Sequence, residues 1–417
     1  MDPFTYFPSE VCDSILEHLT GNEILEASKV SKTWYSIIGA SSKTMQKLKL
    51  RLFWLRGQHR LTCEMSDILV ESNRRYQNVV IKFQSHHIDD FKLIMEPECR
   101  NWKKVQIERL VFKSAGDVVK LLKSCQNTVV ELELDNLYVK NAIGLETLNF
   151  PKLKSLRKAY IEFENASVND IFTNCKKLEE LTIISGSIKE RAIKSIKTIL
   201  KNNNNLKHLE MTSQQINSIF DEDMSVDFKL DTFIATSYCH LPPIVDYKHI
   251  ILNQFQNLKN LSVDSVSCPN TLKLIFKIPK LKCLNIGNID TTSMLFTHKL
   301  LSINKSIEEL GYQDHENDFY FMQCLVDAVP KLKKAEFFSL TQNMMEYMSS
   351  SLKELEALKL RSLDVTNLSS KDLFPKLKKV KIDILSANLH EHMLSIPFDD
   401  CNPLVMLLKD SGYIILN

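Results

Sequence analysis

Glycine and proline are scarce in this sequence, with 9 glycines and 12 prolines among 417 residues. No two glycines lie within five residues of each other. This excludes the G-x-G-x-x-G fingerprint of dinucleotide-binding folds, the P-loop and the G-x-S-x-G elbow of hydrolases. Long Gly/Pro/Ser linkers are absent too, so domain boundaries have to be found from changes of pattern.

Charge of one sign and long apolar runs are also lacking. The 53 lysines and arginines are offset by 51 aspartates and glutamates, and the net charge of +2 argues against a general nucleic-acid binder. No run of about eighteen apolar residues occurs, and residues 1–12 hold no apolar signal-peptide core. We therefore expect a soluble intracellular protein, cytoplasmic and/or nuclear, that contacts neither membrane nor nucleic acid.

The ten cysteines are scattered, and no two are closer than the fifteen residues that separate Cys268 from Cys283. This spacing excludes zinc knuckles and disulfide frameworks. His390-Glu391-His392 comes nearest to a metal cluster, but residues i and i+2 of a helix point apart, and on a strand no third ligand is visible. His86-His87 is typical of solvated surface. We expect no metal, no cofactor and no catalytic residue.

An apolar pattern, L-x-x-L-x-L, recurs at intervals of 22 to 28 residues. The mean interval of about 25 residues falls in the range of leucine-rich repeats and below the periods of ankyrin, TPR and HEAT units. The alternative is an irregular α/β protein. Clear copies start at Val129, Leu178, Leu206, Leu258, Leu281, Leu355 and Leu377; weaker ones start at Ile107, Leu153, Leu230, Ile307 and Leu332, and a doubtful one starts at Tyr76.

Each copy alternates apolar and polar residues, as does a short strand with one buried face. The second half of each unit has a helical pattern, seen most clearly between Gly186 and Asn202. Because one unit cannot bury both its faces, we expect stacked units with a parallel sheet on the concave side and helices on the convex side. The predicted fold class is α/β, a right-handed β-α solenoid of horseshoe shape.

These copies resemble the leucine-rich-repeat family, particularly its branch in which a cysteine precedes the first leucine by three residues, as in Cys175-x-x-Leu178. The resemblance covers about residues 107–385. The family's Asn or Cys at the ninth position is mostly replaced here by aliphatic residues such as Leu137 and Leu363, which removes the usual ladder of side chains onto backbone groups. Residues 402–417 have the pattern of a final helix and strand that cap the exposed end.

The first fifty residues do not follow the repeat, and their pattern predicts three short helices. Pro8 opens the first and Gly21 ends it, Asn22 is the N-cap of the second, and the third opens near Ser31 and carries Trp34. Because so small a bundle buries little surface, we expect its exposed apolar side to pack on a partner.

Residues 4–50 resemble the F-box family. Phe7-Pro8 stands where Leu-Pro is usual, and Glu23-Ile24-Leu25, Val30-Ser31-Lys32 and Trp34 follow in the family's order and spacing, whereas Cys12 replaces a common Leu. The resemblance implies that a Skp-type adaptor docks on these helices. The residues that it assigns to the adaptor-binding surface or its core are Phe7, Pro8, Val11, Ile15, Leu16, Leu19, Ile24, Leu25, Val30 and Trp34.

F-box helices followed by leucine-rich repeats imply the substrate-recognition subunit of an SCF-type E3 ubiquitin ligase. In that family the adaptor joins a cullin-RING scaffold and the repeats hold a protein substrate, so the chain supplies proximity and no chemistry. The alternative is a leucine-rich-repeat scaffold whose helices merely cap the repeats. The expected domains are F-box-like helices at 1–50, linking helices and a degenerate repeat at 51–100, repeats at 101–400 and a cap at 401–417.

A substrate would meet the polar residues that flank the second and third apolar positions of each copy. From the copy at Val129 to that at Ile307, seven of eight charged residues there are acidic, and in the last three copies five of seven are basic. We expect the acidic part to accept a basic segment and the basic part to accept an acidic or phosphorylated segment or a small anion; the alternative is a solvated face. The predicted substrate-binding residues are Glu131, Glu133, Asp135, Glu180 and Glu210, and then Lys359, Arg361, Lys379 and Lys381.

Overall fold

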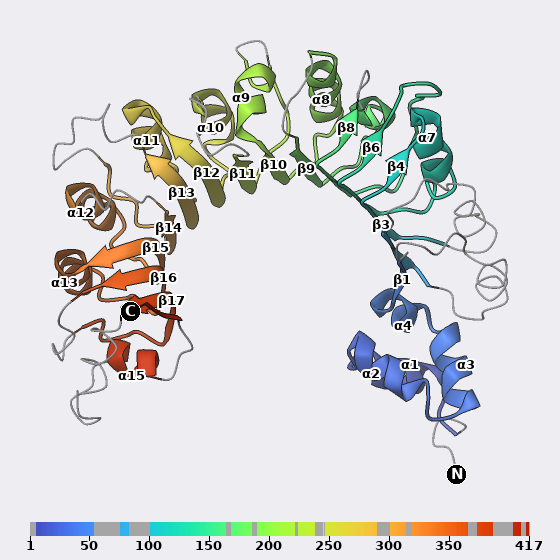
Figure 1. Ribbon diagram of the computed structural model, residues 1–417, viewed down its shortest axis with the longest axis horizontal. Coiled ribbons are helices and arrows are strands. Elements are labelled where there is room, and N and C mark those ends of the chain that lie inside the picture. The colour runs from blue at the N-terminus through green and yellow to red at the C-terminus, as the bar shows by residue number, and fades with distance from the viewer. Residues whose placement is uncertain are drawn as a thin grey trace. The chain divides into compact units, whose positions relative to one another are not determined.

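The chain forms two compact units in a computed structural model, Met1–Leu206 with Val226–Phe228 (unit 1) and Lys207–Ser225 with Lys229–Asn417 (unit 2). Both units are built from the same strand repeat (Figure 1). The structure describes residues 6–53, 76–82, 101–163, 168–185, 190–221, 224–237, 245, 247–289, 301–313, 319–365, 373–386, 403–409 and 414–416.

Unit 1 opens with four helices, where three were predicted. The additional helix is α4, whose N-cap Ser41 accepts a hydrogen bond from the Thr44 N–H at 3.3 Å. Thr20 rather than Asn22 is the N-cap of α2, because Thr20 Oγ1 accepts from the Glu23 N–H at 3.4 Å and the Glu23 carboxylate accepts from the Thr20 N–H at 2.7 Å. The helices are α1 (Ser9–Glu17), α2 (Gly21–Ala27), α3 (Lys32–Ala40) and α4 (Ser42–Lys47).

The remainder of unit 1 is a parallel sheet whose strands lie side by side in chain order. These strands are β1 (Lys49–Phe53), β2 (Asn78–Lys82), β3 (Lys104–Glu108), β5 (Glu131–Asp135), β7 (Ser155–Ala159) and β9 (Glu180–Ile184). A second, short parallel sheet contains β4 (Val111–Phe112), β6 (Tyr138–Val139) and β8 (Glu162–Phe163). The helical segments of these repeats are α7 (Ala115–Lys123), the 3-10 helix η2 (Val168–Phe172) and α8 (Glu190–Asn202).

Unit 2 continues the pattern with parallel strands in chain order and with helices between them. Its strands are β10 (His208–Thr212), β11 (Thr232–Thr236), β12 (Asn260–Val266), β13 (Cys283–Ile289), β14 (Glu309–Tyr312), β15 (Lys334–Thr341), β16 (Ala357–Asp364), β17 (Lys379–Ser386) and β18 (Ile414–Leu416). Its helices are α9 (Ser213–Ile219), α10 (Lys248–Gln254), α11 (Pro269–Ile275), α12 (Phe319–Ala328), α13 (Gln342–Ser351) and α15 (Pro403–Lys409).

The predicted repeat is confirmed with a constant offset: from Val129 to Leu377, a strand begins two residues after each predicted start. The doubtful copy at Tyr76 is also real, since β2 begins at Asn78. The start at Ile107 is wrong, because Ile107 pairs with Leu134 and is therefore the third apolar residue of its copy. That copy starts at the buried Trp102, an aromatic residue that the aliphatic pattern did not include.

The alternating apolar residues of the strands form the core. Leu132, Leu156 and Leu181 lie opposite one another on β5, β7 and β9, and each is 1% exposed or less. The same column in unit 2 runs through Leu261 and Leu284. Full burial of one leucine side chain stabilises a fold by about 1.5–3 kcal/mol, so each repeat gains most of its stability from the neighbours that cover it.

Helices were predicted for the second half of every repeat, and two repeats of unit 1 depart from this. The repeat of β5 continues into β6, and the repeat of β7 into β8 and the 3-10 helix η2. Arg109, Asn136 and Tyr160 follow β3, β5 and β7 with left-handed φ angles of 58°, 53° and 55°. These residues turn the chain at the same point of the three repeats, each of which continues into a short second strand. In the repeat of β3 the helix α7 still follows that strand.

Buried asparagines connect neighbouring repeats through backbone groups. The side chain of Asn203 accepts from the Leu178 N–H at 2.8 Å and donates to the carbonyls of Cys175 and Ile199 at 2.8 and 2.7 Å. Asn304 donates to the carbonyls of two residues of an earlier repeat. Both asparagines stand three residues before a first apolar residue, the position that Cys175 fills in its own repeat, so a ladder exists at a position other than the ninth.

A helix and a strand are present near the C-terminus, where the sequence pattern predicted them: α15 packs beside β17, and β18 pairs with β17 in parallel. The described helices include none with both the length and the apolar character needed to cross a lipid bilayer.

Candidate functional site

The N-terminal helices divide their apolar residues between a core and an exposed surface. Cys12, Leu16, Ile24, Ala27, Ile38, Met45 and Leu48 are buried together, and Leu19, Trp34 and Ile37 pack against them. Phe7, Val11, Ile15, Leu25 and Val30 remain between 38% and 66% exposed. We call these last five residues the exposed apolar set. A bundle of this size cannot cover all of its large apolar side chains, and these five stay in contact with solvent.

The ten sequence-predicted adaptor residues thus have two roles. Leu16 and Ile24 are fully buried and hold the helices together, and Leu19 and Trp34 are partly buried against the same core. The other six, Pro8 and the exposed apolar set, are exposed. Val11 and Ile15 are four residues apart and therefore lie along one side of α1. Tyr6 and Tyr35, 66% and 39% exposed, were missed because the family pattern does not mark them.

A different part of the bundle contacts the first repeats. The Gln77 amide donates to Ser42 Oγ at 2.9 Å, the Asn78 amide donates to the Gln46 carbonyl, and Tyr76 packs on the helical core. These contacts involve α4 and its start. Among the contacts between helices and sheet that the structure describes, none involves the exposed apolar set.

The acidic strand face of unit 1 is partly neutralised by a lysine of the preceding strand. Lys104 on β3 lies 2.6 Å from the Glu131 carboxylate and 3.1 Å from that of Glu133. The register of β3 and β5 places Lys104 opposite Glu131. Asp135 is half-buried, its Oδ1 has no hydrogen-bond partner, and burial raises the pKa of its carboxyl. Glu180 is exposed at the start of β9.

Unit 2 carries the other predicted substrate residues. Glu210 is half-buried on β10. Lys359, Arg361, Lys379 and Lys381 are exposed on the adjacent strands β16 and β17, so the structure brings the four predicted basic residues together. Lys359 Nζ lies 2.5 Å from the Glu336 carboxylate. The charges counted along the sequence did not predict this ion pair.

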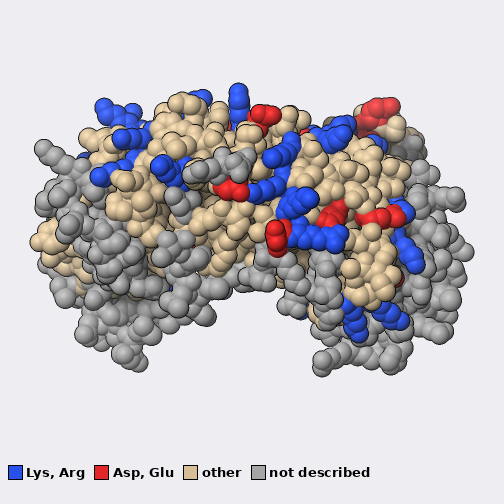
Figure 2. All heavy atoms as spheres, turned by 90° about the horizontal axis from the view of Figure 1, so that it is seen from above, with Lys and Arg blue, Asp and Glu red and all other residues tan. Residues whose placement is uncertain are grey.

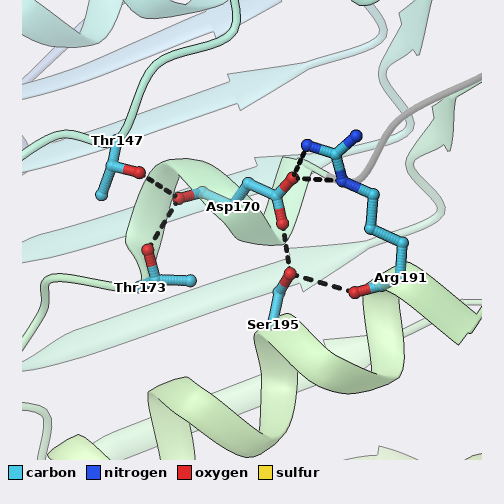
Figure 3. Close-up of polar contacts among 5 residues, drawn as sticks. All are labelled: Thr147, Asp170, Thr173, Arg191 and Ser195. Atoms are coloured by element: carbon cyan, nitrogen blue, oxygen red, sulfur yellow. Dashed lines mark hydrogen bonds and ion pairs between the residues drawn. The ribbon is translucent and has the colours of Figure 1, made fainter.

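Asp170 in η2 joins three successive repeats of unit 1 (Figure 3). Its carboxylate accepts from Arg191 Nε, 2.9 Å away, lies 2.9 Å from Arg191 Nη2, and accepts from the Ser195 hydroxyl. Its carbonyl accepts from the hydroxyls of Thr147 at 3.1 Å and Thr173 at 3.0 Å. These contacts hold η2 against α8.

Lys158 occupies an apolar position in the core of unit 1. The register places it between Leu134 and Ile183, and it is 4% exposed. Its Nζ lies 5.7 Å from the centre of the Phe172 ring. Burial lowers the pKa of this lysine to about 7, because the ammonium ion loses its water, and the nearby Cys175 and Asp170 offset this loss only in part.

The face shown in Figure 2 has basic side chains scattered among uncharged ones, with a few acidic residues between them. Among the described residues, no cluster of three or more His, Cys, Asp or Glu side chains has the geometry of a metal site. His86-His87 and His390-Glu391-His392 lie outside the described residues. The six cysteines whose state is described, Cys12, Cys125, Cys175, Cys268, Cys283 and Cys324, are free thiols.

Comparison with known proteins gives one family match and several similar folds. The F-box domain model matches residues 4–44. No curated protein sequence matches the chain. An internalin of Listeria monocytogenes is 12% identical, with a TM-score of 0.39 and coverage of 86% of this chain and 93% of that one.

Two further solved structures are also 12% identical to this chain. They are TLR13 in its complex with ssRNA13 (TM-score 0.37, 83% of this chain and 58% of that one) and the plant peptide hormone receptor RGFR1 in complex with RGF2 (TM-score 0.25, 84% and 61%). The chain thus spans less than two thirds of each of these two receptors. Residues 4–44 are an F-box domain, and the parallel strand repeats that follow it have the leucine-rich-repeat fold.

Proposed function

We propose that this chain is the substrate-recognition subunit of an SCF-type E3 ubiquitin ligase, acting in the cytoplasm and/or nucleus. The F-box domain would bind a Skp-type adaptor, which links it to a cullin-RING scaffold, and the strand face of the repeats would hold a protein substrate. The observation that carries this proposal is the exposed apolar set, which lies within the F-box match and takes no part in the described contacts between helices and sheet.

The expected mechanism requires no catalytic group in this chain. A substrate held on the repeats meets a ubiquitin-conjugating enzyme on the same assembly. Because both are held in one complex, the effective concentration of substrate lysines near the reactive thioester rises to about 1 mM. Transfer of ubiquitin then depends on geometry that this chain provides.

The size of the adaptor contact follows from exposure. A fully buried aliphatic side chain contributes about 1.5–3 kcal/mol, and Val11, Ile15 and Leu25 each have about two fifths of their surface left to bury. Burial of each of these side chains against the adaptor should therefore contribute about 1 kcal/mol to the binding free energy. An aspartate in such a contact also loses its hydration, which costs several kcal/mol more.

The test is retention of a purified Skp-type adaptor by the full-length chain. Ile15→Asp combined with Leu25→Asp should lower retention at least tenfold, with an unchanged circular dichroism spectrum because both residues are exposed. The matched control is Glu26→Ala with Lys29→Ala, which removes an exposed ion pair from the same helices. If the wild-type chain does not bind the adaptor, or if the apolar variant binds as well as the control, the chain is a leucine-rich-repeat scaffold with a helical cap.

A further inference from the structure

Lysine–glutamate pairs form a ladder across the strands of unit 2. Lys334 on β15 lies 2.5 Å from the Glu309 carboxylate on β14, and Lys359 on β16 lies 2.5 Å from that of Glu336 on β15. The register places each lysine directly opposite its glutamate. In both pairs the later strand supplies the lysine and the earlier strand the carboxylate.

The ladder ends at β17, where a lysine meets a lysine. Lys381 lies opposite Lys359 in the register of β16 and β17, whereas Lys359 itself lies opposite Glu336 of β15. Adjacent strands are about 4.8 Å apart, and like charges directly opposite each other are destabilising. Lys381 Nζ lies 3.8 Å from the carboxylate of Asp383 on its own strand, and the Lys381 side chain is 68% exposed.

Two more cations lie beside this pair. Arg361 has its guanidinium carbon 5.0 Å from the centre of the Phe338 ring, which covers one face of the guanidinium and leaves its edge free to donate. Lys379 lies opposite Ala357, a residue too small to cover it. Within the described part of the chain, no carboxylate forms an ion pair with Arg361 or Lys379.

We propose that Lys359, Arg361, Lys379 and Lys381, the β16–β17 basic face, bind an acidic segment of a protein substrate through its Asp and Glu side chains. The inference rests on the proposed function only in calling the bound protein a substrate. A carboxylate between Lys359 and Lys381 would extend the row of alternating charges that Glu336 and Lys359 begin. A second carboxylate meets the edge of Arg361, which favours two parallel hydrogen bonds.

The charge balance of the strands selects this end of the sheet. Among the side chains of β16 and β17 that the structure describes, this face carries four cations and one acid, Asp383, whereas Lys334 on β15 has its own partner, Glu309. The opposed lysines raise the energy of the unbound face, and an anion between them removes that repulsion. Binding should therefore weaken steeply with salt, since the contacts are exposed.

The experiment uses degenerate peptide libraries with a fixed centre, retained on the immobilised full-length chain. The four centres are Glu-x-Glu, phosphoserine-x-phosphoserine, Ser-x-Ser and Lys-x-Lys. The Glu library should be retained at least tenfold more than the Ser library, and the Lys library least. Arg361→Gln combined with Lys381→Gln should abolish the difference between the Glu and Ser libraries. The control Lys201→Gln, on the exposed face of α8, should leave it unchanged.

Three results would overturn the proposal. Equal retention of the Glu and Ser libraries would exclude an acidic ligand. Retention of the phosphoserine library more than tenfold above the Glu library would make phosphate the ligand, and tighter binding of a single-stranded oligonucleotide than of any peptide would make it a nucleic acid. Because the assay contains no adaptor, its outcome is independent of adaptor binding. Arg361→Lys adds a second check, because it keeps the charge but removes the two parallel N–H donors of the guanidinium. This variant should retain the Glu library at least threefold less than the wild-type chain.

Discussion

Replacement of Lys158 by methionine should stabilise unit 1. The pKa of this lysine falls from an ordinary 10.5 to about 7 on folding, because burial removes water from the ammonium. One pKa unit corresponds to 1.36 kcal/mol, so the difference of about 3.5 units costs the folded state at most about 5 kcal/mol. At pH 7, where folded Lys158 is half protonated, the cost is about 4 kcal/mol. Methionine fills a similar volume without a charge.

The pH dependence distinguishes this explanation from better packing. Between pH 7 and 10.5 the unfolded chain holds a proton that folded Lys158 lacks, so wild-type stability rises with pH in this window. The advantage of Lys158→Met should therefore fall from about 4 kcal/mol at pH 7 to about 2 kcal/mol at pH 9 and vanish near pH 10.5. Urea unfolding at pH 7, 8 and 9 measures it. Lys154→Met, which removes an exposed pair with Glu179, should change stability by less than about 1 kcal/mol. A variant no more stable than wild type, or an advantage independent of pH, would refute the reasoning.

Three other substitutions test the packing. Asn203→Ala should lower the urea midpoint of unit 1 by the equivalent of about 3 kcal/mol, because three backbone groups lose a buried partner; a loss below 1 kcal/mol would mean that water replaces the amide. Asp170→Ala should cost about 2 kcal/mol in the same assay and Arg191→Ala less than about 1 kcal/mol, since Arg191 is 64% exposed; equal losses would contradict the central role of the carboxylate. Gly287→Ala would put a Cβ 2.2 Å from the Asp264 carbonyl oxygen, so we expect a lower thermal midpoint and a loss of about 2–3 kcal/mol, and an unchanged midpoint would contradict this close approach.

The sequence was sufficient for the repeat because the burial of every second strand residue imposes an aliphatic pattern that recurs at a nearly fixed spacing. It failed at Trp102, which begins a copy but is aromatic. The copy at Leu153 was placed correctly, but the pattern did not show that its Lys158 is buried in the apolar column of Leu134 and Ile183. Local spacing alone does not distinguish Trp102 from a tryptophan in a loop. It does not distinguish Lys158 from a lysine on the surface either.

The candidate surfaces were predicted in part. Local spacing identified α1, the helix that carries Val11 and Ile15. It did not show that Leu16 is buried and Ile15 exposed, because this depends on how α1 packs against the other helices. The neutralisation of Glu131 by Lys104 depends on strand register, which residues 27 positions apart do not reveal. Contact between Arg361 and Phe338 was missed for the same reason.

Strand pairing between successive repeats also determines how unit 2 would respond to mechanical force. Each of its inner strands is bonded only to the strands of the preceding and following repeats. Tension applied along the chain therefore acts on one interface at a time, and repeats should detach singly, beginning where β18 covers β17. Each step would free about 25 residues, or about 85 Å of extended chain. A force–extension trace with evenly spaced steps of that size would be the mechanical counterpart of the repeat in the sequence.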